Sequence, residues 1–133
     1  MRYFFLLLLI LVIPLSSCTQ GADAYFLQGL SRYKLGDYRG AIEDYNQAIR
    51  LNPQFEQAYV ARGGAKSKLG DHRGAIEDYN QAIQLDPKLA EAYVLRGLSK
   101  IQLNQKNSGC LDLSKAGELG DASTYGFIRL FCN

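Results

Sequence analysis

A repeat of 34 residues constrains this chain more than any other feature of its sequence. Residues 37–49 return as residues 71–83 with one change, His72 in place of Tyr38. The same offset relates three tyrosines, three glycines and two prolines: Tyr25, Tyr59 and Tyr93; Gly29, Gly63 and Gly97; Pro53 and Pro87. A fixed period of this length indicates a chain built by stacking one small unit. Such stacks favour an extended binding surface over a catalytic pocket.

Each unit is predicted to hold two amphipathic helices. Apolar and small residues recur at helical spacing from Ala24 to Tyr33, and Gly36 follows as a left-handed cap. Asp37 is placed to cap the next helix, which Pro53 ends. Small residues are predicted to let the paired helices approach closely, namely Gly29, Gly63 and Gly97 facing Ala41, Ala48, Ala75 and Ala82.

This pattern resembles the tetratricopeptide repeat, a helix–turn–helix unit of 34 residues. Residues 22–55 and 56–89 match it at the early aromatic, the glycine four residues later, the paired alanines of the second helix and the terminal proline. A third unit, 90–120, diverges, with Asn104 at the capping glycine, Gly109 at the first alanine and Leu113 at the tyrosine. The resemblance implies an all-α, right-handed α-solenoid of about three units.

The last segment, 121–133, is expected to form a C-terminal capping helix that begins at Asp121 and covers the final apolar face. Tyr125, Ile128 and Cys132 would lie on one side of it. The remaining apolar residues are open to three interpretations: core, a partner site, or a poorly soluble end that the envelope setting protects. They are Phe127, Leu130 and Phe131.

The N-terminus has the pattern of a targeting segment. Eleven apolar residues, 3–13, are too few to span about 30 Å of hydrocarbon as a helix. Leu15, two serines and Cys18 follow, which resembles the lipobox of a bacterial lipoprotein. The resemblance implies a signal peptide at 1–17, a lipid-modified Cys18 in a short linker, 18–21, and membrane anchoring at the bacterial cell envelope through acyl chains such as palmitate. The alternative is an ordinary secreted protein or an uncleaved anchor. Thr19 favours the outer membrane only in a Gram-negative organism.

If Cys18 carries lipid, the other two cysteines, Cys110 and Cys132, remain as a pair. An exported protein reaches an oxidising compartment, where a disulfide persists. We therefore expect a Cys110–Cys132 disulfide, with two buried free thiols as the alternative.

Charge and side-chain chemistry argue against several functions. The net charge is +2, and the basic residues form no stripe along the sequence, so no nucleic-acid partner is expected. His72 is the single histidine, which makes a metal site improbable. Adjacent carboxylates such as Glu43 and Asp44 diverge by about 100° on a helix, so no enzyme activity and no cofactor are predicted. Recurring Asp and Arg residues instead predict a ladder of ion pairs or hydrogen bonds between adjacent units, at Asp44, Asp78, Asp112, Arg62 and Arg96.

The family resemblance also implies a partner groove, because the first helix of each unit lines the concave face of the superhelix. By position, the groove would contain Phe26, Leu30, Tyr33, Lys34, Val60, Gly64, Ser67, Lys68, Val94, Leu98, Ile101 and Gln102. Some relatives grip a C-terminal carboxylate with Lys and Asn near the start of these helices, whereas apolar residues and a glycine stand there here. The expected ligand is an amphipathic helix or extended segment with apolar anchors and an acidic neighbour. The alternative is that several of these residues only pack within the solenoid.

The sequence therefore suggests a non-enzymatic, lipid-anchored adaptor that binds a protein partner. The alternative is a structural subunit that self-associates through its C-terminal helix into a homo-oligomer.

Overall fold

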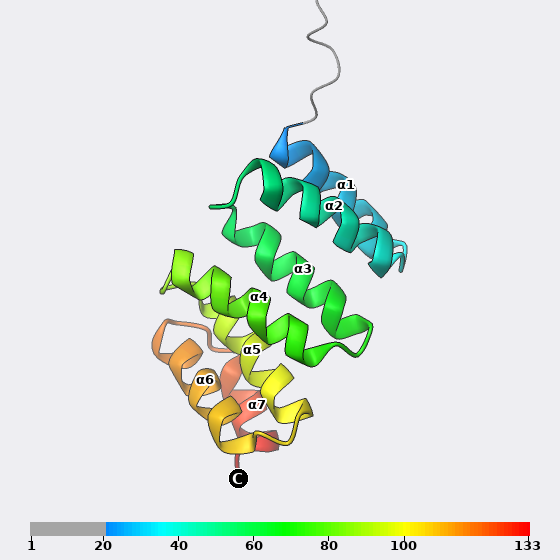
Figure 1. The fold of residues 1–133 in the computed structure, drawn as a ribbon. Coiled ribbons are helices and arrows are strands. Elements are labelled where there is room, and N and C mark those ends of the chain that lie inside the picture. Colours follow the sequence, from blue (N-terminus) through cyan, green and yellow to red (C-terminus); the bar gives the residue numbers. More distant parts are fainter. Residues whose placement is uncertain (1–20) are drawn as a thin grey trace, which may run out of the picture.

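A computed structural model describes residues 21–133, and the expected signal segment and Cys18 lie outside them. The described part contains seven helices and no strand (Figure 1), which confirms the all-α fold class. They are α1 (Ala22–Lys34), α2 (Tyr38–Leu51), α3 (Glu56–Lys68), α4 (His72–Leu85), α5 (Ala90–Gln102), α6 (Lys106–Glu118) and α7 (Thr124–Phe131). None of these helices is long and apolar enough to cross a membrane.

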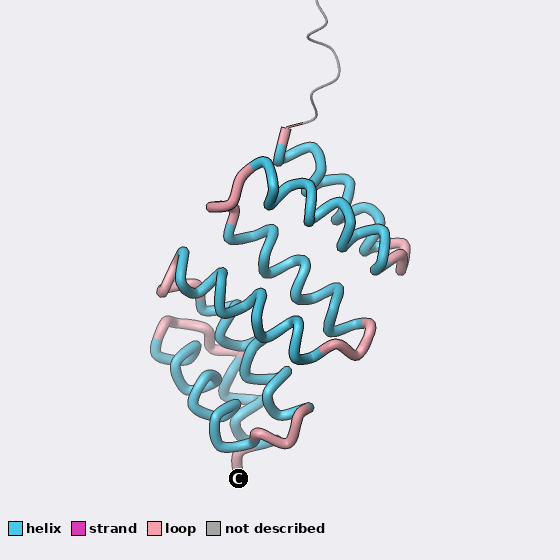
Figure 2. The backbone as a smooth tube through the Cα atoms, in the orientation of Figure 1, coloured by secondary structure: helices cyan, strands magenta, loops and turns pink. Residues whose placement is uncertain are grey.

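The helices form three hairpins that stack in chain order, joined by short loops (Figure 2). The two helices of each hairpin pack against each other. The first hairpin contacts the second, the second contacts the third, and α7 packs on α6. The core is divided into three clusters, centred on Tyr45, Tyr79 and Leu113. The architecture is therefore a short solenoid whose units are held by nearest-neighbour contacts.

The predicted caps are confirmed. The Asp37 carboxylate accepts a hydrogen bond from Gly40 N at 3.0 Å at the start of α2, and Asp71 repeats this contact at the start of α4. Gly36 has φ +81° and Asn104 has φ +61°, the left-handed conformation that turns the chain out of α1 and α5.

Close helix approach at the repeated glycines is also confirmed, with a different partner from the alanines that we expected. A Cβ on Gly29 would lie 2.5 Å from the Tyr45 ring, and Gly63 stands in the same relation to Tyr79. In the third unit a Cβ on Gly97 would lie 2.8 Å from the backbone oxygen of Gly109. Two of the departures of this unit are thus linked. Leu113 is smaller than the tyrosine of the other units, so the two helices come close enough for backbone contact, and this contact requires Gly109 in place of alanine.

The expected start of the last helix is wrong. α7 begins at Thr124, and Asp121 instead accepts hydrogen bonds from the backbone N and hydroxyl of Ser123 in the preceding turn. The buried side of α7 includes Phe127, Ile128 and Cys132, which pack against α5 and α6.

Tyr125, expected on that buried side, is 62% exposed. Thr124 is fully buried in its place, because the turn that ends at Ser123 sets the rotation of the helix. The structure joins Cys110 in α6 to Cys132 after α7, with their Cα atoms 5.8 Å apart.

The charged ladder runs differently from the prediction. Arg62 in α3 binds both carboxylate oxygens of Asp78 in α4, at 2.9 and 2.6 Å, so this ion pair lies within one unit. The link to the preceding unit is a hydrogen bond from the charged Arg62 guanidinium to a neutral acceptor, from Nη1 to Asn46 Oδ1 at 2.8 Å. Lys66 forms a second ion pair with Asp78, with its Nζ atom 2.9 Å from Oδ2.

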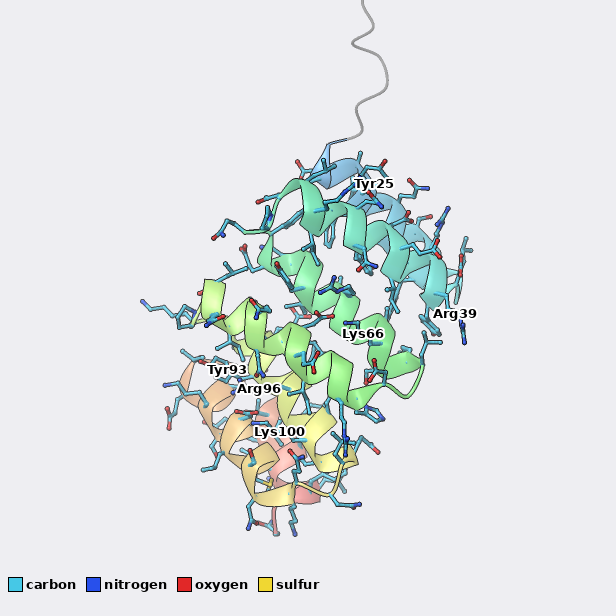
Figure 3. All side chains as sticks on the ribbon, viewed as in Figure 1. Tyr25, Arg39, Lys66, Tyr93, Arg96 and Lys100 are labelled. Atoms are coloured by element: carbon cyan, nitrogen blue, oxygen red, sulfur yellow. A yellow bond between two sulfur atoms is a disulfide. The ribbon has the colours of Figure 1, made fainter. Side chains whose placement is uncertain are left out.

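The third unit repeats this arrangement (Figure 3). Arg96 binds Asp112 and reaches back to Asn80, Lys100 joins Asp112 at 2.8 Å, and the Arg96 guanidinium lies over the Tyr93 ring. The first unit lacks this arginine, because Gln28 occupies its position in the repeat. Asp44 is left with Arg32 at 3.4 Å.

Candidate partner-binding groove

A cavity of about 400 Å³ opens between the first helices of the first two units and the start of the third. Its walls are mainly apolar. They comprise Phe26, Leu30 and Tyr33 from α1, Tyr45 from α2, Gln57, Val60, Ala61 and Gly64 from α3, and Leu89, Glu91 and Leu95 at α5. Phe26 is held in this wall by Tyr45 and Phe55, whose ring centroids lie 5.9 and 4.8 Å from its own.

A second cavity of about 320 Å³ continues along α3 and α5. It is more polar and is lined by Tyr33, Gly64, Ser67, Lys68, His72, Tyr79, Leu95, Leu98, Ser99 and Gln102. Tyr33, Gly64 and Leu95 line both cavities, so the two form one continuous groove across α1, α3 and α5.

The structure brings most of the expected groove residues to this surface. Cavity walls contain Phe26, Leu30, Tyr33, Val60, Gly64, Ser67, Lys68, Leu98 and Gln102. Lys34, at the end of α1, lines neither cavity.

Two residues expected in the groove pack towards the interior instead. Val94 lies in the core with Leu113 and Ala116, and the half-buried Ile101 packs against this cluster beside Gly109. Leu95, the neighbour of Val94, faces the groove. Adjacent helix positions point about 100° apart, so the rotation of α5 about its own axis decides which of the two faces the groove.

Sequence reasoning also missed Tyr45, Ala61 and Glu91 as wall residues. Ala61 and Leu95 are 34 residues apart and so occupy the same position of the repeat. This shared position could have predicted that both line the groove. Tyr45 comes from the second helix of its unit, whereas the family resemblance implies a groove lined by first helices.

The hydroxyl of Tyr45 is fully buried and has no hydrogen-bond partner among the described residues. Burial raises the pKa of Tyr45 to about 12, with the Tyr33 hydroxyl and Asp44 adding to the effect. Burial likewise raises the pKa of Tyr79. Both phenols therefore remain protonated donors at neutral pH.

Unpaired charges mark the groove at two places. Glu91 stands at the first cavity and Lys68 at the second, and neither forms an ion pair within residues 21–133. The described residues contain no cluster of three metal-ligating side chains.

Ser67 Oγ lies 3.3 Å from His72 Nδ1 in the second cavity. Within residues 21–133 no carboxylate hydrogen-bonds the other ring nitrogen, so the pair lacks the third group that orients a catalytic base.

A short α-solenoid with a groove along its first helices defines a repeat scaffold of the protein-binding class. A family model described as TPR repeat matches residues 29–70 and 65–104. The chain therefore belongs to the tetratricopeptide repeat family, whose scaffolds are generally non-enzymatic protein-binding domains. No curated protein matches the chain.

Solved structures share the fold. The first TPR domain of Spaghetti (RPAP3), bound to an HSP90 peptide, is 23% identical, with a TM-score of 0.81 over 85% of this chain and 94% of that one. The second TPR domain of Spaghetti, bound to the same peptide, is 28% identical, with a TM-score of 0.73 over 75% and 93%. MamA is 28% identical, with a TM-score of 0.72 over 74% of this chain and about half, 54%, of its own.

Proposed function

We propose that this protein is a non-enzymatic adaptor that holds a segment of a partner protein in the groove across α1, α3 and α5. The continuity of the two cavities carries the proposal, because it offers an extended segment about 700 Å³ of adjoining space, roughly the size of known ligand sites. The peptide-bound TPR domains of Spaghetti support it by likeness of fold.

The test is crosslinking in cells, followed by identification of the captured proteins. The double variant Leu30→Glu/Leu98→Glu places charge in both cavities and is expected to lose the partner. Leu111→Glu is the matched control, since Leu111 is 72% exposed and lines neither cavity. An unchanged set of partners in the double variant rules out the groove.

The adaptor is further proposed to be a lipoprotein anchored through Cys18 to the bacterial cell envelope. The support is the apolar run followed by Leu15-Ser16-Ser17-Cys18 in the sequence. Labelling growing cells with radioactive palmitate should mark the wild type, and Cys18→Ser should lose both the label and membrane retention. A labelled, membrane-bound Cys18→Ser variant would refute the anchor.

A second candidate function is self-association through α7. Leu130 is 71% exposed and Tyr125 62% exposed on the outer side of this terminal helix. Light scattering should then show a dimer that Leu130→Lys converts to a monomer. A wild-type monomer at high micromolar concentration argues against this function.

A further inference from the structure

We propose that the groove recognises a protein segment with one large apolar side chain, which fills the cavity beside Gly64, flanked by a cationic residue at Glu91 and an anionic residue at Lys68. This inference rests on the proposed adaptor function and specifies the chemistry of its partner. Three observations carry it.

The first observation is the wall of the larger cavity. Phe26, Leu30, Val60 and Leu95 surround a space of about 400 Å³, and the polar residues of the wall are Gln57 and Glu91, with two tyrosines beside them. Apolar walls gain most from a ligand group that removes apolar surface from water. An aromatic or long aliphatic side chain meets that requirement.

The second observation is Gly64, in the middle of α3. Its neighbour Gly63 is required by packing, since a Cβ there would lie 2.7 Å from the Tyr79 ring. A Cβ on Gly64 would meet nothing nearer than the Tyr33 hydroxyl at 4.0 Å. Glycine lowers helix propensity, and internal packing does not account for it at this position. Gly64 lines both cavities, so the missing side chain keeps the groove open for a ligand.

The third observation is the position of the unpaired charges. Glu91 lines the apolar cavity and Lys68 lines the adjoining one, so opposite charges stand at successive positions along one groove. A segment with a positive residue on one side of its anchor and a negative residue on the other complements both.

The probe is a random peptide library displayed on phage and selected against the full chain in lipid nanodiscs. We expect enriched peptides to share one large apolar residue with a basic residue on one side and an acidic residue on the other. Selection against Glu91→Lys should replace the basic residue by an acidic one, and Lys68→Glu should replace the acidic residue by a basic one. An enriched pattern that neither variant changes overturns the inference.

A matched pair at one position tests the anchor. Gly64→Ala and Gly64→Leu both increase helix propensity, but only leucine reaches into the cavity. Titration of the best peptide should show Gly64→Ala binding within about twofold of the wild type and Gly64→Leu at least tenfold weaker. Equal binding by the two variants rejects the cavity as the anchor site. If circular dichroism shows that Gly64→Leu does not fold, the peptides selected against Glu91→Lys and Lys68→Glu decide whether the inference holds.

The inference and the adaptor function can fail separately. If crosslinked partners depend on Leu30 and Leu98 but bind through segments without an apolar anchor, the function stands and the inference is wrong. If no partner depends on the groove, the function itself is refuted.

Discussion

At the scale of single residues, the charged ladder shows how one substitution weakens a repeat. Asp78 and Asp112 each receive an arginine and a lysine, whereas Asp44 has Arg32 alone at 3.4 Å. Its Oδ2 atom is buried and makes no hydrogen bond within the described chain. Burial raises the pKa of Asp44, and the Arg32 charge offsets this only partly. The first unit therefore contains a carboxylate whose ionised form is poorly stabilised.

Gln28→Arg is expected to restore the missing contact and to stabilise the fold by about 1 kcal/mol. Arg62→Gln, the reverse change in the second unit, should destabilise it by about 1–3 kcal/mol, because it removes hydrogen bonds to a buried carboxylate. Thermal unfolding measures both. A lower midpoint for Gln28→Arg would contradict this account of Asp44.

The same residue predicts a pH dependence. The folded-state pKa of Asp44 lies above its ordinary value of 3.8, so the folded chain binds this proton more tightly than the unfolded chain. Its contribution to stability therefore falls as pH rises from about 3.8 through the folded pKa. The gain from Gln28→Arg should be larger at pH 7 than at pH 4 in urea titrations. An equal gain at both pH values would exclude Asp44 as the cause.

Two adjacent glycines in α3 make a further residue-scale prediction. Gly63→Ala forces a methyl group against the Tyr79 ring and should cost about 1–3 kcal/mol. Gly64→Ala meets open space and should stabilise by up to about 1 kcal/mol through helix propensity. Urea unfolding midpoints should move in opposite directions. A shift in the same direction would show that α3 moves to accommodate either side chain.

At the scale of elements, α7 is held on the third unit by the packing of Phe127 and Ile128 and by the link between Cys110 and Cys132. Closing a 22-residue loop is worth roughly 3 kcal/mol by chain entropy. Cys110→Ser/Cys132→Ser should therefore lower stability by about this amount and increase hydrogen exchange mainly in α7. Uniform loss of protection across α3 to α7 would instead indicate one cooperative unit.

At the scale of the whole molecule, a solenoid held by nearest-neighbour contacts need not be equally stable along its length. The last unit is covered by α7 and the disulfide, while the first contains the weakly paired Asp44. We expect backbone amides of α1 and α2 to exchange at a lower opening free energy than those of α4. Hydrogen exchange with mass analysis measures this gradient, and equal protection of α2 and α4 would contradict it.

Much of the fold was predictable because the repeat encodes local structure directly. Gly36, Asp37 and Asn104 predicted the ends of their helices, since left-handed and capping positions favour these residue types whatever surrounds them. The 34-residue period predicted the stack itself, because each unit repeats the same buried face.

The tertiary structure decided what depends on how the helices are rotated and spaced. It placed Leu95 in the groove and Val94 in the core, paired Arg62 with Asp78 inside one unit, and buried Thr124 in place of Tyr125. Neighbouring positions on a helix differ by about 100°, and long side chains reach two helices at once, so sequence spacing alone does not select between such alternatives. The sequence by itself determined a stack of helical hairpins. The packed structure determined which side chains line its groove.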